Sequence, residues 1–147
     1  MKKGDKPIIV EENYQVPIEQ VWSALTDLEK MRQWYFGNIP AFKPEVGFNT
    51  QFNVQSEDRI FPHQWRVTEV NPPQMITYTW RFDGYQGDSF VVFELFKQKE
   101  ATKLRLTVQI LESFPQDIPE FTRESCIAGW NYFLKQRLKE FLEKTID

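Results

Sequence analysis

Cysteine and histidine are almost missing from this chain of 147 residues, where Cys126 and His63 are the only examples of each. A single cysteine cannot form an internal disulfide, which is typical of a protein kept in a reducing compartment. A metal site needs several His, Cys or carboxylate ligands at suitable spacing, and this pair does not supply them. We therefore expect neither a disulfide framework nor a bound metal.

Long apolar runs and clustered basic residues are lacking as well. Nothing approaches the ~18 apolar residues that cross a bilayer, and the short run at residues 8–10 is too brief for a signal peptide. The 18 Lys and Arg residues are outnumbered by 21 Asp and Glu, and the net charge of −3 argues against nucleic-acid binding. These features predict a cytoplasmic, soluble protein that binds neither membranes nor nucleic acid.

The motifs of common catalytic sites are also absent. The chain has no Ser/His/Asp arrangement, no Gly-rich phosphate loop and no paired carboxylates on one face. Glu11 and Glu12 are adjacent in a predicted strand, so they point to opposite faces and cannot act together on one atom. Binding is therefore favoured over catalysis, and we expect no cofactor.

Aromatic residues, in contrast, are abundant at 16% of the chain, including 13 Phe and 5 Trp. Each large aromatic side chain buries roughly 150–250 Å² when it leaves water. So many aromatic residues either fill a core or line a hollow that a ligand occupies.

Two short helices are predicted early in the chain. Pro17 suits the first position of a helix, and apolar residues at helical spacing predict a helix over residues 18–25. A second helix begins near Leu28, with Thr26 and Asp27 as alternative caps.

The rest of the chain reads as strands followed by one long helix. A strand over residues 8–14 precedes the helix pair, and alternating runs such as 104–110 predict about six antiparallel strands in total. From about residue 118 to residue 144 an apolar stripe predicts a helix on the order of 40 Å long. One helix cannot cover a sheet this wide, so we expect a single domain over residues 1–147 in which the sheet curls around the helix.

Several short segments carry a family resemblance in the order in which they occur. The helix pair at 16–36 is the most informative, and the others are PEVG at 44–47, VTEVNPP at 67–73, YTW at 78–80, VVFEL at 91–95, TKLRL at 102–106 and GW at 129–130. Together they resemble the Hsp-90 ATPase activator homologue-like family of the START/Bet v 1-like (SRPBCC) superfamily. The resemblance implies an α+β helix-grip fold in the order β-α-α-β-β-β-β-β-α.

The resemblance also implies a hollow between the sheet and the long helix, since superfamily members often bind lipids, hormones or polyketides there. Two positions depart from the family pattern. Phe48 stands where a second glycine often follows the one matching Gly47, and Val108 stands where many members have a histidine. Both changes remove space or polarity, which makes a ligand shared with better-known relatives doubtful.

The candidate ligand-binding residues are mostly aromatic side chains on predicted inward faces. They are Trp34, Phe36, Phe52, His63, Trp65, Tyr78, Trp80, Phe93, Arg123, Gly129, Trp130 and Phe133. An aromatic face at this spacing is more often plain core than a pocket wall.

Three of these positions have two interpretations each. Gly129 in mid-helix, which costs roughly 1 kcal/mol relative to Ala, leaves room for a ligand or packs closely on a bulky residue such as Trp80. Arg123 meets an acidic ligand at the mouth of the hollow or extends past the helix end to water. His63 acts chemically or, as is more common for a strand residue, hydrogen-bonds a neighbour.

The sequence is compatible with three functions. The first is a monomer or weak dimer that encloses a small hydrophobic or amphipathic molecule. The second, which the resemblance implies, is a co-chaperone-like domain that contacts a chaperone and takes part in a stress response. The third is a cyclase-like or hydrolase-like enzyme that uses His63 or Arg123, although no nucleophile motif supports it.

Overall fold

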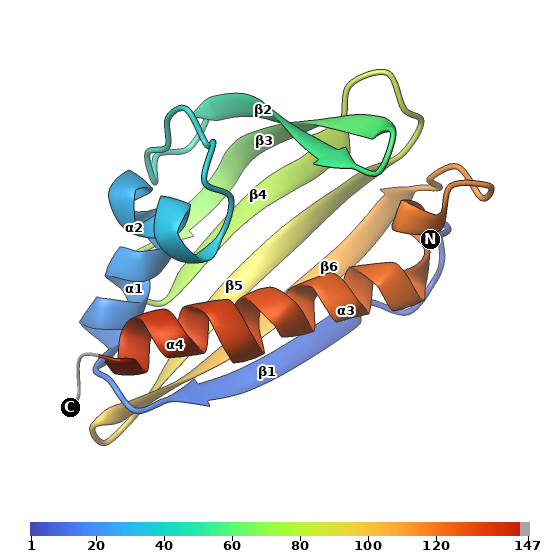
Figure 1. Ribbon diagram of the computed structural model, residues 1–147. Helices are drawn as coiled ribbons and strands as arrows, with labels where there is room; N and C mark the ends of the chain where they lie inside the picture. The colour runs from blue at the N-terminus through green and yellow to red at the C-terminus, as the bar shows by residue number, and fades with distance from the viewer. Residues whose placement is uncertain (145–147) are drawn as a thin grey trace.

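A curved sheet wraps around one long helix in the computed structural model, which describes residues 1–144 (Figure 1). The six antiparallel strands lie in the order β1-β6-β5-β4-β3-β2, so β2 to β6 form a meander and β1 adds to its far edge. The predicted helix-grip fold is confirmed. The elements are β1 (Ile8–Tyr14), α1 (Ile18–Thr26), α2 (Leu28–Trp34), β2 (Asn49–Ser56), β3 (Arg59–Asn71), β4 (Met75–Phe82), β5 (Asp88–Gln98), β6 (Ala101–Glu112), η1 (Pro119–Phe121), α3 (Arg123–Asn131), η2 (Tyr132–Arg137) and α4 (Leu138–Glu143).

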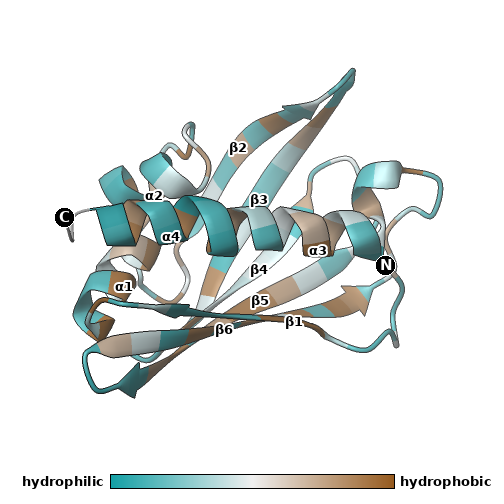
Figure 2. Ribbon diagram, turned by 60° about the horizontal axis from the view of Figure 1, so that its bottom comes forward, coloured by the Kyte–Doolittle hydropathy of each residue, from teal (hydrophilic) through white to brown (hydrophobic). Residues whose placement is uncertain are grey.

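The strands place their apolar side chains on the concave face, against the helix. In β6 every second residue from Thr102 to Ile110 is buried, and the residues between them are half-buried on the outer face. Brown and teal segments accordingly alternate along β2 in Figure 2. The period of two in the sequence therefore corresponds to the two faces of the sheet.

The two short helices follow from local capping chemistry. Pro17 occupies the position before α1 with an extended ψ of 158°, and it makes no side-chain cap. Of the two alternative caps for α2, the structure uses Asp27, whose carboxylate accepts a hydrogen bond from the Lys30 amide at 3.2 Å. The Thr26 hydroxyl instead donates to the Trp22 carbonyl at 2.8 Å, within α1.

The long helix begins later than predicted. Pro119 opens a single 3₁₀ turn, and the Thr122 hydroxyl then accepts from the Ser125 amide at 3.2 Å to start α3 at Arg123. The predicted start at residue 118 is wrong because Pro119 initiates this separate turn and Thr122 provides the true cap.

A π-helical segment, η2, also interrupts the long helix. The buried residues are Trp130, Leu134, Leu138 and Leu142, which are four apart each time. In an α-helix of 3.6 residues per turn this spacing drifts by about 40° per step. The wider i→i+5 turns of η2 offset that drift, so all four side chains stay directed at the sheet.

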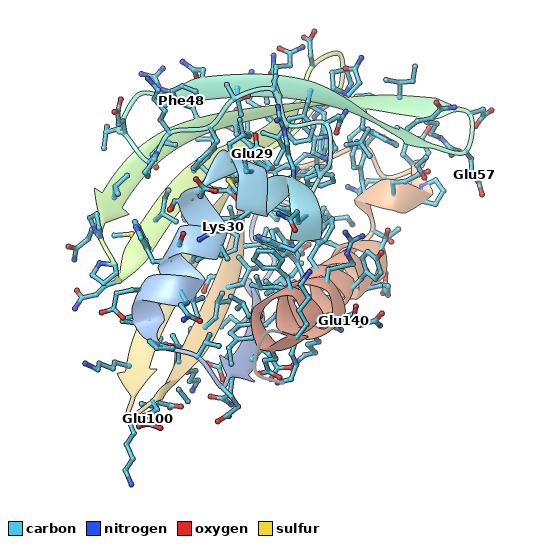
Figure 3. The ribbon with its side chains drawn as sticks, turned by 60° about the vertical axis from the view of Figure 1, so that its left-hand side comes forward. Glu29, Lys30, Phe48, Glu57, Glu100 and Glu140 are labelled. Carbon is cyan, nitrogen blue, oxygen red and sulfur yellow. The ribbon has the colours of Figure 1, made fainter. Side chains whose placement is uncertain are left out.

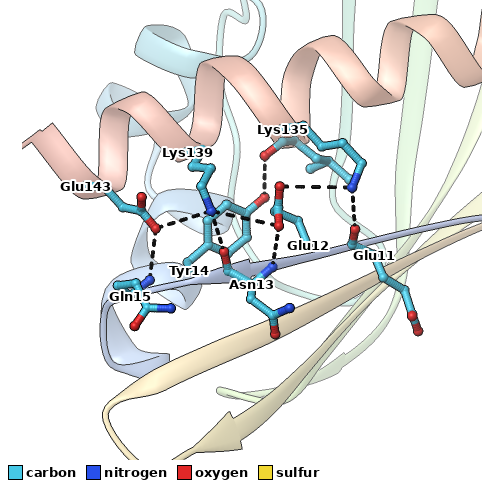
Figure 4. Close-up of polar contacts among 9 residues, drawn as sticks. Glu11, Glu12, Asn13, Tyr14, Gln15, Lys135, Lys139 and Glu143 are labelled. Atoms are coloured by element: carbon cyan, nitrogen blue, oxygen red, sulfur yellow. Dashed lines mark hydrogen bonds and ion pairs between the residues drawn. The ribbon is translucent and has the colours of Figure 1, made fainter.

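Helix side chains cover the free edge of β1 (Figure 4). The Tyr14 hydroxyl on β1 donates to the Leu134 carbonyl at 2.7 Å, which fixes the helix over the strand. Outward-facing backbone groups of β1 and the residue after it bond to side chains of η2 and α4. The pairs are Lys135 Nζ to Glu11 O at 2.8 Å, Lys139 Nζ to Asn13 O at 2.8 Å, and Gln15 N to Glu143 Oε2 at 3.0 Å. These bonds protect an edge that could otherwise pair with another strand.

Side chains fill much of the space between the helices and the sheet (Figure 3). In that view Phe48 lies at the start of β2 and Glu57 at the tip of the β2–β3 hairpin. None of the helices within residues 1–144 is long and apolar enough to cross a bilayer.

Candidate functional site

A cavity of about 290 Å³ lies between the concave face of the sheet and the first half of the long helix. Strands β2 to β6 each contribute to its wall, η1 and Phe114 close one end, and α3 with Phe133 forms the opposite side. This is the place where the family resemblance implies a hollow. The volume is near the lower end of the range of small-molecule sites, about 300–1,000 Å³.

Five of the twelve candidate residues line this cavity. They are His63, Trp80, Gly129, Trp130 and Phe133. The rings of Trp80 and Trp130 meet edge to face at 5.4 Å between centroids, and Phe133 lies 6.2 Å from Trp130. Val108, the position that departs from the family pattern, also belongs to the wall and makes it apolar.

The other seven candidates lie outside the lining. The rings of Phe36 and Phe52 each lie 5.2 Å from the His63 ring. Phe93 is buried and lies 5.8 Å from the Trp130 ring. Trp34, Trp65 and Tyr78 are fully buried core residues. Arg123, at the start of α3, is the seventh. The structure therefore divides the predicted aromatic face into a cavity wall and a packed core behind it.

Tyr35, which was not among the candidates, organises that core. Its ring stacks on Trp34 at 4.4 Å and on Trp65 at 5.2 Å. Its hydroxyl forms a 2.9 Å hydrogen bond with the Tyr78 hydroxyl, and burial raises the pKa of both phenols well above the usual value. Tyr35 directly follows α2, so no strand or helix period in the sequence indicates its inward direction.

His63 is a neutral side chain in an aromatic environment. Its ring lies 5.2 Å from Phe52 and 4.7 Å from Phe82. Burial lowers the pKa of His63 to about 4, although a hydrogen bond to the Phe61 carbonyl partly opposes the shift. That bond, 2.9 Å from Nδ1, is the imidazole's only one among residues 1–144, so no nucleophile contacts it there.

Gly129 faces open space. Apart from its two chain neighbours and the helix's own backbone, no heavy atom lies within 4 Å of the position that a Cβ would take. Of the two interpretations drawn from the sequence, close packing against Trp80 is therefore wrong. The missing side chain instead enlarges the cavity at the middle of its helical wall.

Arg123 turns away from the cavity. Its guanidinium donates to the Lys6 carbonyl at 2.6 Å and to the Pro7 carbonyl at 3.2 Å. The side chain therefore ties the start of α3 to the segment before β1, and it does not face the space where a ligand would lie.

Glu120 on η1 is a polar wall residue that the sequence did not indicate. Its Oε2 accepts from the Ser56 hydroxyl at 2.8 Å and from Arg59 at 3.3 Å, and both partners lie next to the β2–β3 turn. The hydrogen bond from Ser56 and the nearby Arg59 charge hold the pKa of this carboxyl below its usual value. Its other oxygen, Oε1, is fully buried and has no hydrogen-bond partner in the described chain. The contacts are long-range, so no local motif could have predicted them.

Cys126 is a cavity residue with an unreactive thiol. Burial raises its pKa to about 11, although hydrogen bonding to the Trp130 side chain and the Arg123 charge act in the opposite direction. The thiol therefore stays protonated at neutral pH, and a thiolate is the reactive form of cysteine. Within residues 1–144 no three His, Cys, Asp or Glu residues group as metal ligands.

Several solved structures share this architecture. CV1439 from Chromobacterium violaceum has a TM-score of 0.78 at 24% identity, over 93% of this chain and 96% of that one. MLL2253 from Mesorhizobium loti has a TM-score of 0.73 at 26% identity, over 95% and 98% of the two chains. DynU16, a protein of the dynemicin biosynthetic locus, has a TM-score of 0.74 at 28% identity over 96% of this chain but only 48% of its own. A comparison with curated proteins found no match.

A curved sheet that grips a terminal helix above a lined cavity defines the START/Bet v 1-like (SRPBCC) class of proteins. Within this class, residues 15–143 match the family model described as Activator of Hsp90 ATPase homolog 1-like protein. The match covers most of the chain, and the chain belongs to this family.

Proposed function

We propose that the protein binds a small, mainly apolar molecule in the cavity between the sheet and α3. The observation that carries the proposal is Gly129, a residue unfavourable in mid-helix, at a point where its missing side chain adds to the cavity. A residue retained only for packing would touch its neighbours, and this one does not.

The size and walls of the cavity indicate the size and type of ligand. Its 290 Å³ corresponds to about ten water molecules at roughly 30 Å³ each. The rings of Trp80, Phe82, Trp130 and Phe133 offer edges and faces to a flat aromatic molecule. A ligand of about ten heavy atoms that gains roughly 0.5 kcal/mol per atom would bind with a Kd on the order of 0.1 mM.

Naphthalene titration followed by backbone amide NMR tests this proposal. We expect the largest shift changes at residues around the cavity, such as Val91, Val108 and Gly129. The variant Gly129→Leu fills the space and should lose the response. Ala128→Leu, one residue away on the exposed side of α3, should keep it.

Two results would overturn the proposal. One is the absence of cavity shifts with naphthalene at its solubility limit. The other is a Gly129→Leu variant that is folded and still binds as well as Ala128→Leu.

A second candidate function is contact with an Hsp90-type chaperone, which the family membership supports. An ATPase assay of purified chaperone with and without this protein tests it. Stimulation of the ATPase would support the co-chaperone role, while neither binding nor stimulation would remove it.

A further inference from the structure

The hydrogen-bond chemistry of the cavity wall narrows the class of ligand, provided that the proposed function holds. The carbonyl of Phe61 can only accept a hydrogen bond, so Nδ1 of His63 must carry the proton in their 2.9 Å contact. The buried imidazole is neutral at pH 7 and holds one ring proton. Nε2 is therefore bare, and it can only accept.

Nε2 is accessible from the cavity. It has no partner among the described residues, yet it is not among the fully enclosed unpartnered atoms, which are Thr50 Oγ1, Trp65 Nε1 and Glu120 Oε1. His63 is only 6% exposed and lines the cavity, so the cavity is the space through which Nε2 is reached.

The carboxylate of Glu120 is a second polar group of the wall, and it is ionised because Ser56 and Arg59 stabilise its charge through Oε2. Its Oε1 is fully enclosed, so a ligand in the cavity cannot reach it. The wall hydroxyls of Ser56 and Ser89 already donate, to Glu120 and to the Trp80 carbonyl. The Met1 ammonium, which also lines the cavity, donates to the Phe121 carbonyl at 3.0 Å. Nε2 of His63 is thus an unpaired acceptor that a ligand in the cavity can reach.

We propose that the cavity selects aromatic molecules that carry a neutral hydrogen-bond donor, such as a phenol hydroxyl or an aryl N–H, and that His63 Nε2 accepts this hydrogen bond. Aromatic hydrocarbons leave Nε2 unpaired. Aromatic carboxylates bring no donor at neutral pH, and the opposite charges of Glu120 and the Met1 ammonium at the wall offset each other's effect on an anion.

Four ligands built on one ring system test the selection. 2-Naphthol donates, 2-methoxynaphthalene only accepts, naphthalene does neither, and 2-naphthoate is anionic. One net hydrogen bond changes affinity by about threefold to tenfold, so 2-naphthol should bind tighter than naphthalene and 2-methoxynaphthalene by that factor. Both comparison ligands are more apolar, so apolar burial alone predicts the opposite order.

One variant assigns the effect to the named atom. His63→Phe keeps a ring of similar size but removes Nε2, and the preference for 2-naphthol should fall below twofold while 2-methoxynaphthalene still binds.

The possible outcomes separate this inference from the proposed function. If none of the four ligands binds, the proposed function fails and the inference fails with it. If they bind but 2-methoxynaphthalene equals 2-naphthol in the unmodified protein, only the inference is overturned. A preference for 2-naphthol over 2-methoxynaphthalene that persists in folded His63→Phe also overturns the inference. The comparison of the four ligands on the unmodified protein tests the inference even if His63→Phe does not fold.

Discussion

Replacement of Gly129 by alanine should make the protein more stable. Glycine in a helix interior costs about 1 kcal/mol relative to alanine, because the unfolded chain loses more backbone freedom. That gain is normally cancelled where the added methyl meets neighbours. At Gly129, apart from the two chain neighbours and the helix backbone, no heavy atom lies within 4 Å of the new Cβ. We therefore expect Gly129→Ala to raise the free energy of unfolding by about 0.5–1 kcal/mol.

For a chain of this size such a gain raises Tm by about 2–4 °C, which differential scanning calorimetry resolves. Ala128 supplies the reverse control, because it lies on the exposed side of the same helix. Ala128→Gly should lower the free energy of unfolding by about 1 kcal/mol. A Gly129→Ala variant that loses 1 kcal/mol or more would show that the position is closely packed and that the cavity does not reach it.

Three further predictions concern folding energetics. Gly87→Ala should lower the free energy of unfolding, measured in urea, by at least about 2 kcal/mol, because φ is +121° and the methyl would overlap the Phe114 ring. The control Gly84→Ala, at φ +83° in open space, should lower it by only about 1 kcal/mol. Equal losses would contradict the close contact between Gly87 and Phe114. Burial lowers the pKa of His63 to about 4, so the unfolded chain takes up its proton at a higher pH than the folded protein does. The contribution of His63 to the free energy of unfolding is therefore constant above pH 7, falls by up to about 3 kcal/mol between pH 6.5 and pH 4, and is level below that. The difference in unfolding free energy between wild type and His63→Phe should follow this curve, and a difference independent of pH would exclude a buried neutral imidazole. Tyr14→Phe removes the hydrogen bond to the Leu134 carbonyl and should lower the free energy of unfolding by about 1 kcal/mol. The control Tyr132→Phe, at an exposed ring, should change it very little. A Tyr14→Phe variant as stable as this control would show that the hydrogen bond does not stabilise the helix over β1.

Much of the fold was predictable because local signals and the global architecture agree. The alternation along residues 104–110 corresponds to β6, and the Pro17 signal corresponds to the start of α1. The agreement ends at the long helix. The 3-4-4-3 spacing of its apolar residues predicts Phe141 on the buried side, whereas the helix with the π-helical segment Tyr132–Arg137 buries Leu142 and leaves Phe141 only partly buried. A periodicity of 3.6 assumes α-helical geometry and cannot reveal a change of helix type.

The candidate site was predictable only in part, for a different reason. Trp65 and Trp80 both lie on inward-facing strand positions and look alike in the sequence, yet one is core and the other is cavity wall. The distinction depends on where the helix lies above the sheet, and hence on contacts between distant segments. The contact between Glu120 and Ser56 is of the same kind, since 64 positions separate the two residues.

Intermolecular nuclear Overhauser effects between protein protons and bound 2-naphthol show whether a ligand occupies the cavity. We expect contacts from the ligand ring to Val91, Val108 and the Gly129 α-protons, which lie on opposite walls of the cavity. Contacts confined to the outer face of the sheet, or none at saturating ligand, would rule out binding between the sheet and α3.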